Sequence, residues 1–316
     1  MRILVLCHQD LVPPNLLLSD QKIENKPWRT EAFVGQALIK NGHNIEYCGL
    51  KDDLSPLKKK LKKFNPQLVF NLLEEFADEG LLEHFAVSYL ENVGQPYSGC
   101  SSEALILCKN KILAKTVMKS HGVLVPGNSK YPKIVKLVDE ESSRGLDSGS
   151  IVASRDEELA QRAKLRCTFR SEIFVENYIA GRELHVAVIK KNKKFLISPV
   201  WETSFGLAKN KILTEKNKWN FTYRNKNKIQ LKLAEKLSPE LIKKIQSSAI
   251  KCCRALSINS YARVDIRLSE GHKAYVIEVN PNPDLAKFDE FSECIKSMSI
   301  PYEELIELIV EQGLKK

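Results

Sequence analysis

Apolar positions in the first part of the chain form short continuous runs separated by stretches with helical spacing. Runs at 2–7, 44–48 and 68–71 predict buried strands, and the spacing at 31–41 and 57–64 predicts helices. Asparagine followed by glycine or proline is typical of the end of a helix, and such pairs follow both helical stretches. Strands that alternate with helices over short connections predict a parallel α/β layer.

A second unit is expected after residue 98, where a turn follows one more predicted helix at 80–93. The predicted elements of this unit, residues 99–180, are the helix 109–120, the strand 133–138, the helix 156–164 and the strand 174–178. A loop rich in serine and glycine occupies 140–150. Small residues with free backbone N–H groups are typical of loops that cover phosphates.

The third unit, residues 181–316, combines strands with longer helices. Its predicted elements are the strand 182–188, the helix 239–256, the strands 261–268 and 274–280, and the helix 302–312. Residues 207–228 are polar and basic without clear periodicity, so we expect a mobile loop or lid there. The whole pattern predicts an α/β protein of three units with boundaries near 98 and 180.

The two strands at 261–268 and 274–280 have the most informative polar positions. Residues two apart in a strand share a face, so Arg263 and Asp265 point one way, and Glu278 and Asn280 share a face of the next strand. A short connection makes the pair an antiparallel hairpin, which brings Asp265 close to both. Converging carboxylate and amide oxygens favour Mg²⁺. The alternative is a surface hairpin whose outer face is merely polar.

Lys136 interrupts an apolar strand, where a buried ammonium group requires an anion. The loop that follows adds the hydroxyl groups of Ser142 and Ser143 as possible phosphate ligands. The alternative is a lysine at the edge of a strand whose charged end reaches solvent. Further along, Glu176 or Glu183 could accept hydrogen bonds from nucleotide hydroxyl or amino groups.

Composition excludes several classes of protein. The chain has no apolar stretch of membrane-spanning length, so we expect no membrane partner and a cytoplasmic location. Its 8 cysteines lack metal-site spacing and are expected to be free thiols, and its 6 histidines form neither a pair nor a metal-binding motif. The net charge of +10 comes largely from lysine runs without interleaved aromatics, which favours solvated surfaces over nucleic-acid contact.

Several motifs, in order along nearly the whole chain, resemble the ATP-grasp superfamily and, within it, the D-alanine–D-alanine ligase group. They are Phe70-Asn71-Leu72-Leu73-Glu74, Leu90-Glu91-Asn92-Val93-Gly94-Gln95-Pro96-Tyr97-Ser98-Gly99, Asn110-Lys111, Ile134-Val135-Lys136, Glu176, Gly181-Arg182-Glu183, Ala262-Arg263-Val264-Asp265 and Ile277-Glu278-Val279-Asn280. The resemblance implies an ATP-grasp fold with an N-terminal Rossmann-like (pre-ATP-grasp) domain and two α+β subdomains. It also implies an ATP-dependent ligase that forms carbon–nitrogen bonds. A homodimer is compatible with this family.

The same resemblance implies roles for individual residues. Lys111 and Lys136 would contact ATP, Glu176 and its backbone the adenine, and Glu183 the ribose. Asp265, Glu278 and Asn280 are implied to hold Mg²⁺ (or Mn²⁺). Arg263 and Lys226 are implied to act in catalysis. Glu31 and Glu74 are implied to approach the first substrate.

Two departures from the family pattern bear on the substrate. The N-terminal glycine- and serine-containing motif is replaced by Cys7-His8-Gln9-Asp10, and the Ser-Leu pair expected after Asn280 is absent. The expected function is therefore a carboxylate–amine ligase acting on an amino acid or small peptide, with small-molecule carboxylate and amine substrates. The alternative is a catalytically altered nucleotide-binding regulatory or interaction protein of the same fold.

Overall fold

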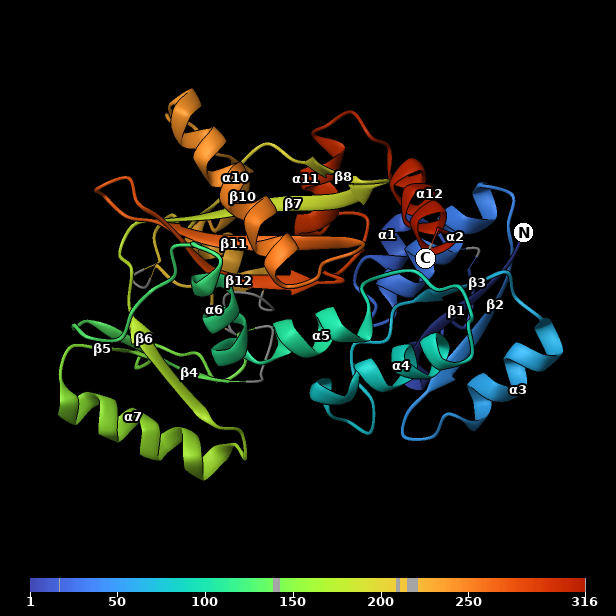
Figure 1. Ribbon diagram of the computed structural model, residues 1–316, viewed down its shortest axis with the longest axis horizontal. Helices are drawn as coiled ribbons and strands as arrows, with labels where there is room; N and C mark the ends of the chain where they lie inside the picture. Colours follow the sequence, from blue (N-terminus) through green and yellow to red (C-terminus); the bar gives the residue numbers. More distant parts are fainter. Residues whose placement is uncertain (17, 139–142, 209–210, 215–220, 316) are drawn as a thin grey trace.

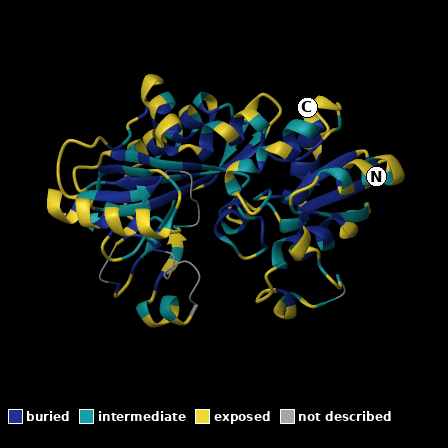
Figure 2. Cartoon of the chain, turned by 90° about the horizontal axis from the view of Figure 1, so that it is seen from below, coloured by how far each residue is buried: buried dark blue, intermediate teal, exposed yellow. Residues whose placement is uncertain are grey.

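The computed structural model describes the chain except for residues 17, 139–142, 209–210, 215–220 and 316. The described residues form three β-sheets with helices packed on their faces (Figure 1). Buried residues concentrate in the strands, and the outer faces of the helices are exposed (Figure 2). No described helix combines the length and apolar character required to cross a bilayer.

The N-terminal sheet is parallel, with strand order β2-β1-β3. Its strands are β1 (Arg2–His8), β2 (Asn44–Leu50) and β3 (Leu68–Asn71), and its helices are α1 (Asp20–Ile23), α2 (Arg29–Lys40), α3 (Ser55–Phe64) and α4 (His84–Asn92). The predicted parallel layer is confirmed. The single helix predicted at 80–93 is instead a 3₁₀ turn, Gly80–Leu82, followed by α4, because the chain changes helix type at Glu83.

The second sheet contains six strands in the order β10-β9-β7-β11-β12, with β8 also paired to β7, and every neighbouring pair is antiparallel. The strands are β7 (Arg182–Lys191), β8 (Lys194–Ile197), β9 (Trp201–Ser204), β10 (Gln230–Leu233), β11 (Tyr261–Leu268) and β12 (Ala274–Pro281). Helix α10 (Pro239–Ala255) begins at Ser238, whose hydroxyl caps Leu241 N–H, and packs against β7, β11 and β12.

The third sheet is small and antiparallel, with order β5-β4-β6. It comprises β4 (Lys133–Leu137), β5 (Ile151–Val152) and β6 (Ile173–Asn177), and α7 (Arg155–Thr168) packs on it through Leu165. Helices α5 (Ser102–Lys109) and α6 (Lys111–Ser120) lead into this unit. The helix predicted at 109–120 was therefore incomplete, because Asn110 ends one helix and caps the next.

The chain ends with α11 (Glu290–Lys296) and α12 (Tyr302–Gly313). Helix α12 returns to the N-terminal sheet, where Ile306 and Ile309 share a core with Ile3 and Phe70. The predicted boundaries near 98 and 180 stay a prediction. All eight cysteines are free thiols, as predicted.

Residues 207–228 were expected to lack regular structure. That prediction is wrong in part, because the described portion includes helix α9 (Phe221–Asn227). The strands β8 to β10 and helix α11 were not predicted, since each is short and its pattern of polar residues resembles that of a loop.

Candidate active site

A cleft with about 830 Å³ of open space separates the small β4–β6 sheet from the β11–β12 hairpin. One wall comes from each sheet, and the cleft is also lined by Ser143, Leu146, Ile212 and Leu213. The cleft brings together the predicted site residues Lys136, Ser143, Glu176, Glu183, Arg263, Asp265, Glu278 and Asn280. Apolar side chains interspersed with a few converging polar groups, as in this lining, are typical of small-molecule and cofactor sites.

The strand register of the hairpin produces the polar wall. Arg263 pairs with Asn280 and Asp265 pairs with Glu278, and the register shifts after Asp265. Alternation along β11 puts Val264 and Ile266 on the opposite face, where both are fully buried in the main core. Burial of the apolar face therefore makes the polar side chains point into the cleft, since a shift of the strand register by one residue would bury the charged groups.

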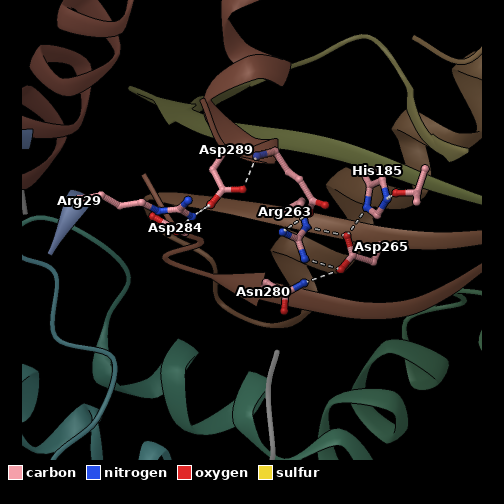
Figure 3. Close-up of polar contacts among 9 residues, drawn as sticks. Arg29, His185, Arg263, Asp265, Asn280, Asp284 and Asp289 are labelled. Atoms are coloured by element: carbon pink, nitrogen blue, oxygen red, sulfur yellow. Dashed lines mark hydrogen bonds and ion pairs between the residues drawn. The ribbon is translucent and has the colours of Figure 1, made fainter. Parts of the chain in front are cut away.

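Asp265 forms hydrogen bonds with three neighbouring side chains (Figure 3). Arg263 donates from Nε to Oδ1 at 2.8 Å and from Nη2 to Oδ2 at 2.9 Å. His185 Nδ1 lies 2.8 Å from Oδ1, and Asn280 Nδ2 donates to Oδ2 at 2.8 Å. Burial by itself would raise the pKa of Asp265, but Arg263 and the His185 hydrogen bond outweigh it and hold the pKa far below the usual range.

Arg263 also contacts a second carboxylate, since its Nη1 lies 2.9 Å from Glu290 Oε2 at the start of α11. The guanidinium is thus fixed between two acids in a fork that suits bidentate contacts. Arg263, Asn280 and Glu290 line both this cleft and a second pocket. Arg263 therefore stands at the junction of the two cavities.

The donor set of the hairpin fits a divalent cation of the Mg²⁺ type. Carboxylate and amide oxygens are the ligands that Mg²⁺ prefers, and Glu278 and Asn280 both line the cleft. Asn280 turns its amide oxygen away from Asp265 (Figure 3). The hydrogen bonds from Arg263, His185 and Asn280 occupy the acceptor positions of Asp265, so a cation bound there would replace at least one of them.

Lys111 faces Glu278 from the first turn of α6, with Nζ 3.2 Å from Oε1. Asn110 caps this helix by accepting from Ile112 N–H and Leu113 N–H. The asparagine therefore stabilises the helix that positions Lys111. Lys111 does not line the cleft itself, but its ammonium reaches a carboxylate that does.

Two lysines share the buried carboxylate of Glu176 across the small sheet. Lys136 Nζ lies 3.0 Å from Oε1, and Lys115 contacts Oε2 from α6. Burial would raise the pKa of Glu176, but the two ammonium groups lower it below its usual value. Burial lowers the pKa of Lys115, whereas Glu176 outweighs burial at Lys136 and raises its pKa. Glu176 and Lys136 both line the cleft, so the anion required by Lys136 is Glu176.

Glu183 lies further along the same cleft, at the start of β7. Arg267 Nη1 donates to its Oε2 at 2.9 Å, and Arg267 also donates to Tyr178 Oη at 3.0 Å. Burial raises the pKa of Glu183, although Arg267 opposes it. The carboxyl group that faces the cleft is therefore held by an arginine that the sequence did not single out.

The second pocket, with about 1800 Å³ of open space, adjoins the first at Arg263. It is lined by Arg29 and Arg224 as well. Arg29 Nη2 lies 3.2 Å from Asp284 Oδ2 and 2.6 Å from Asp289 Oδ2 (Figure 3). Burial and the neighbouring Asp284 raise the pKa of Asp289 to about 7.

Glu31 and Glu74 line a third pocket of about 720 Å³, and Glu74 also lines the second. Glu31 is only 3% exposed, and its Oε2 has no hydrogen-bond partner among the described atoms. Burial, helped by the nearby Glu74 and Asp284, raises the pKa of Glu31 to about 8, against the lowering effects of a backbone hydrogen bond and of Arg29. The two predicted substrate residues thus line one pocket, which shares Arg29, Glu74 and Asp284 with the second pocket.

Two of the predicted residues have a different outcome. Lys226 lies on α9 with its side chain exposed and does not line the cavities described above; Arg224, two residues earlier, lines the second pocket instead. Ser142 lies outside the described residues, while Ser143 lines the cleft with a left-handed φ of 65°.

His185 is the main site residue that sequence reasoning missed. Its Nδ1 contacts Asp265 and its Nε2 lies 2.7 Å from Thr203 Oγ1. A signal was available, because His185 is a polar residue in an apolar strand and lies two positions from Glu183 on the same face. Lys115 and Arg267 gave weaker signals, since single basic residues are common in helices and strands.

The chain is similar in sequence to proteins of one known family. The family model described as "D-ala D-ala ligase C-terminus" matches residues 109–311. An uncharacterized protein, y4sG, of Sinorhizobium fredii is 28% identical over 90% of this chain and 88% of its own length. A D-alanine–D-alanine ligase of Thermotoga maritima is 26% identical over 91% of this chain and 92% of its own.

The fold matches a solved structure over the whole chain. The D-alanine–D-alanine ligase of Bacillus anthracis, complexed with ATP, superposes with a TM-score of 0.74 at 21% identity and covers 100% of this chain and 98% of its own. The architecture is therefore the ATP-grasp fold, as predicted.

The protein belongs to the D-alanine–D-alanine ligase family of ATP-grasp proteins, because the family model covers well over half of its length. The predicted class, an ATP-dependent ligase that forms carbon–nitrogen bonds, is confirmed at the level of this family.

Proposed function

We propose that the protein is an ATP- and Mg²⁺-dependent carboxylate–amine ligase that activates an amino acid or small peptide as an acyl phosphate. The observation that carries the proposal is the position of Arg263. It lies beside the oxygen donors Asp265 and Asn280 and lines both the cleft and the second pocket. A γ-phosphoryl group in the first cavity would meet a carboxylate from the second at this point.

The proposed reaction has two steps. A substrate carboxylate oxygen forms a bond to the γ-phosphorus of ATP while the bond to ADP breaks. The amine of the second substrate then attacks the acyl carbon, phosphate leaves, and the nitrogen loses a proton. Such phosphoryl transfer depends mainly on positioning and on neutralising negative charge. A divalent cation held by Asp265, Glu278 and Asn280 would neutralise part of the phosphate charge.

The chain's own residues supply the remaining requirements. Arg263 would contact the transferred phosphoryl group with a guanidinium whose orientation is already fixed by Asp265 and Glu290. Lys136 would face the phosphates as a positive charge from the opposite wall, and Lys111 would reach them from beside Glu278. Glu183 would accept from the ribose hydroxyls, and the β6 backbone beside Glu176 would meet the adenine.

The acceptor side differs from the pattern of D-alanine ligases. The segment after Asn280 offers Asp284 and Asp289, bound to Arg29, where the family has a Ser-Leu pair. We therefore leave D-alanine out of the proposal and retain an amino acid or small peptide as the carboxylate and amine substrates.

The test is ADP release in the presence of ATP and Mg²⁺ over a panel of amino acids and dipeptides. The proposal requires at least one combination to stimulate ADP formation, with loss of that stimulation in Glu278→Ala. Glu270→Ala provides the matched control, since Glu270 lies in the exposed turn of the same hairpin. Tight ATP binding without stimulated turnover by any combination would contradict the ligase and favour a nucleotide-binding regulatory protein.

A further inference from the structure

A cluster of metal-binding side chains lies in the N-terminal unit, apart from the cleft. His8 ends β1, and Glu75 and Asp78 belong to the loop that follows β3. Because β1 and β3 are parallel neighbours, their carboxyl ends meet at one edge of the sheet. One ligand atom from each of the three residues lies within 4.8 Å of the others.

The imidazole of His8 itself indicates a ligand. His8 is only 7% exposed, and its Nε2 has no hydrogen-bond partner among the described atoms. The carboxylate oxygen Oε1 of Glu75 lies 3.8 Å away, which is too far for a hydrogen bond. A buried ring nitrogen without a partner is destabilising. The ring nevertheless directs this atom towards the two carboxylates.

The loop presents Asp78 to the cluster through an unusual turn. Ala77 and Asp78 both have a φ of 57°, and Phe76 and Glu79 exchange two backbone hydrogen bonds across them, at 3.2 and 3.1 Å. Turns of this kind favour glycine or asparagine. The backbone is held further by the 2.7 Å hydrogen bond from Ala77 N–H to Lys51 O. Asp78 is thus kept at the mouth of the cluster although its side chain is 66% exposed.

Two other charged groups face the cluster. Asp10 Oδ2 lies 3.7 Å from His8 Nδ1, on the side of the ring away from the proposed ligand. Asp10 N–H also donates to Nδ1 at 3.4 Å, which suits the tautomer with the proton on Nε2. When Nε2 binds a cation, the proton moves to Nδ1, where Asp10 Oδ2 can accept it in place of the contact with Asp10 N–H. Lys51 Nζ lies 3.5 Å from Asp78 Oδ1 and would be displaced, which its 38% exposed side chain permits.

From this geometry we propose that His8 Nε2, Glu75 and Asp78 bind a divalent transition-metal ion such as Zn²⁺. One imidazole nitrogen and two carboxylate oxygens give the three protein ligands of an open zinc site, in which water takes the fourth position. The site shares no residue with the Asp265, Glu278 and Asn280 set. No metal-binding spacing in the sequence predicts this site, because the ligands come from two segments about seventy residues apart that the parallel β1–β3 pairing brings together.

The test is calorimetric titration of the metal-free protein with ZnCl₂. We expect the wild type to take up one equivalent of Zn²⁺ that Glu75→Gln and Asp78→Asn bind about tenfold more weakly or lose altogether. Glu79→Gln is the matched control, because Glu79 is an exposed carboxylate in the same turn, and it should bind as the wild type does. Comparing variants with the wild type cancels zinc bound elsewhere, for example at the β11–β12 hairpin or at the exposed Cys167.

Nitrogen-15 spectra of the histidine rings provide a second readout that does not depend on folding of a His8 variant. Zn²⁺ should shift the His8 Nε2 resonance of the wild type and leave Nδ1 protonated. Equal zinc uptake by the wild type, Glu75→Gln and Asp78→Asn would overturn the proposal. An unshifted His8 ring at saturating Zn²⁺ would overturn it as well.

Discussion

The guanidinium of Arg263 grips the carboxylate of Asp265 two residues along the same strand, with Nε–Oδ1 and Nη2–Oδ2 distances of 2.8 and 2.9 Å. Residues two apart share a face of β11, so both side chains point towards the cleft. Arg263 is a cation that can bind phosphoryl and acyl groups, and Asp265, directly beside it, is an anion that can bind a metal ion.

Replacing Arg263 with lysine keeps the charge but removes the planar fork, so the contacts to Asp265 and Glu290 cannot both be made. We expect the substrate-stimulated rate of ADP release to fall by roughly 10²- to 10³-fold, as for loss of one preorganised charge-stabilising group. Steady-state assays at saturating ATP measure this effect. Arg254→Lys, at an exposed position of α10, should retain the wild-type rate, and full activity of Arg263→Lys would contradict the assigned role.

His185 is predicted to act as a positioning residue. It connects Thr203 to Asp265, so His185→Asn should remove one of the hydrogen bonds that orient the Asp265 carboxylate. We expect the concentration of Mg²⁺ required for half-maximal activity to rise by about tenfold, with a loss of about 1–3 kcal/mol in the free energy of unfolding from the buried groups left without partners.

The metal dependence separates positioning from a purely structural role, because simple destabilisation would not change the Mg²⁺ requirement of the folded fraction. His272→Asn, in the exposed turn of the same hairpin, is the matched control and should change neither quantity. An unchanged Mg²⁺ requirement in His185→Asn would refute the positioning role.

Glu176 balances two buried ammonium groups, and Glu176→Gln would leave Lys115 and Lys136 with a neutral partner. Breaking such a buried arrangement costs about 3–5 kcal/mol of folding free energy. Urea unfolding monitored by circular dichroism measures the loss. Glu172→Gln, at an exposed position just before β6, should change stability by less than about 0.5 kcal/mol. Equal free energies of unfolding for the two variants would show that the contacts of Glu176 with Lys115 and Lys136 do not stabilise the fold.

The buried carboxyl of Glu31 should make stability depend on pH. Its pKa rises from 4.5 to about 8 in the folded protein, so the folded state keeps a proton that the unfolded chain releases. This contribution is complete below pH 4.5 and is lost as the pH rises through about 8. The loss amounts to roughly 3–5 kcal/mol over that range.

Glu31→Gln cannot ionise, so its unfolding free energy minus that of the wild type should increase between pH 5 and 9. Guanidinium unfolding at several pH values measures this difference. Glu24→Gln, at an exposed position near α2, should give a difference that does not vary with pH. A flat difference for Glu31→Gln would mean that Glu31 is ionised at neutral pH.

Local patterns were sufficient for much of the fold and for the β11–β12 hairpin. Strong apolar alternation fixes which face of each strand is buried, and this places Arg263, Asp265, Glu278 and Asn280 on one wall. Short strands at the sheet edge were missed because a sequence such as Gln230–Leu233 alternates too briefly to differ from a loop.

Side chains that meet only through tertiary contacts were also missed. Lys115 reaches Glu176 from a helix, and Arg267 reaches Glu183 across two paired strands. Lys226 was expected at the site from a loose correspondence in a basic segment, where a shift of two residues makes Arg224 the residue that lines the second pocket. Apolar periodicity in a helix or strand indicates which residues face the core, whereas a polar segment without periodicity gives no such indication.

The most direct test of the account is a crystal structure of the protein with a non-hydrolysable ATP analogue and Mn²⁺, using anomalous scattering to locate the cations. The account predicts the triphosphate in the cleft beside Arg263 and at least one anomalous peak in contact with Glu278 and Asn280. A bound nucleotide with no anomalous peak at these side chains, or a nucleotide outside the cleft, would contradict it.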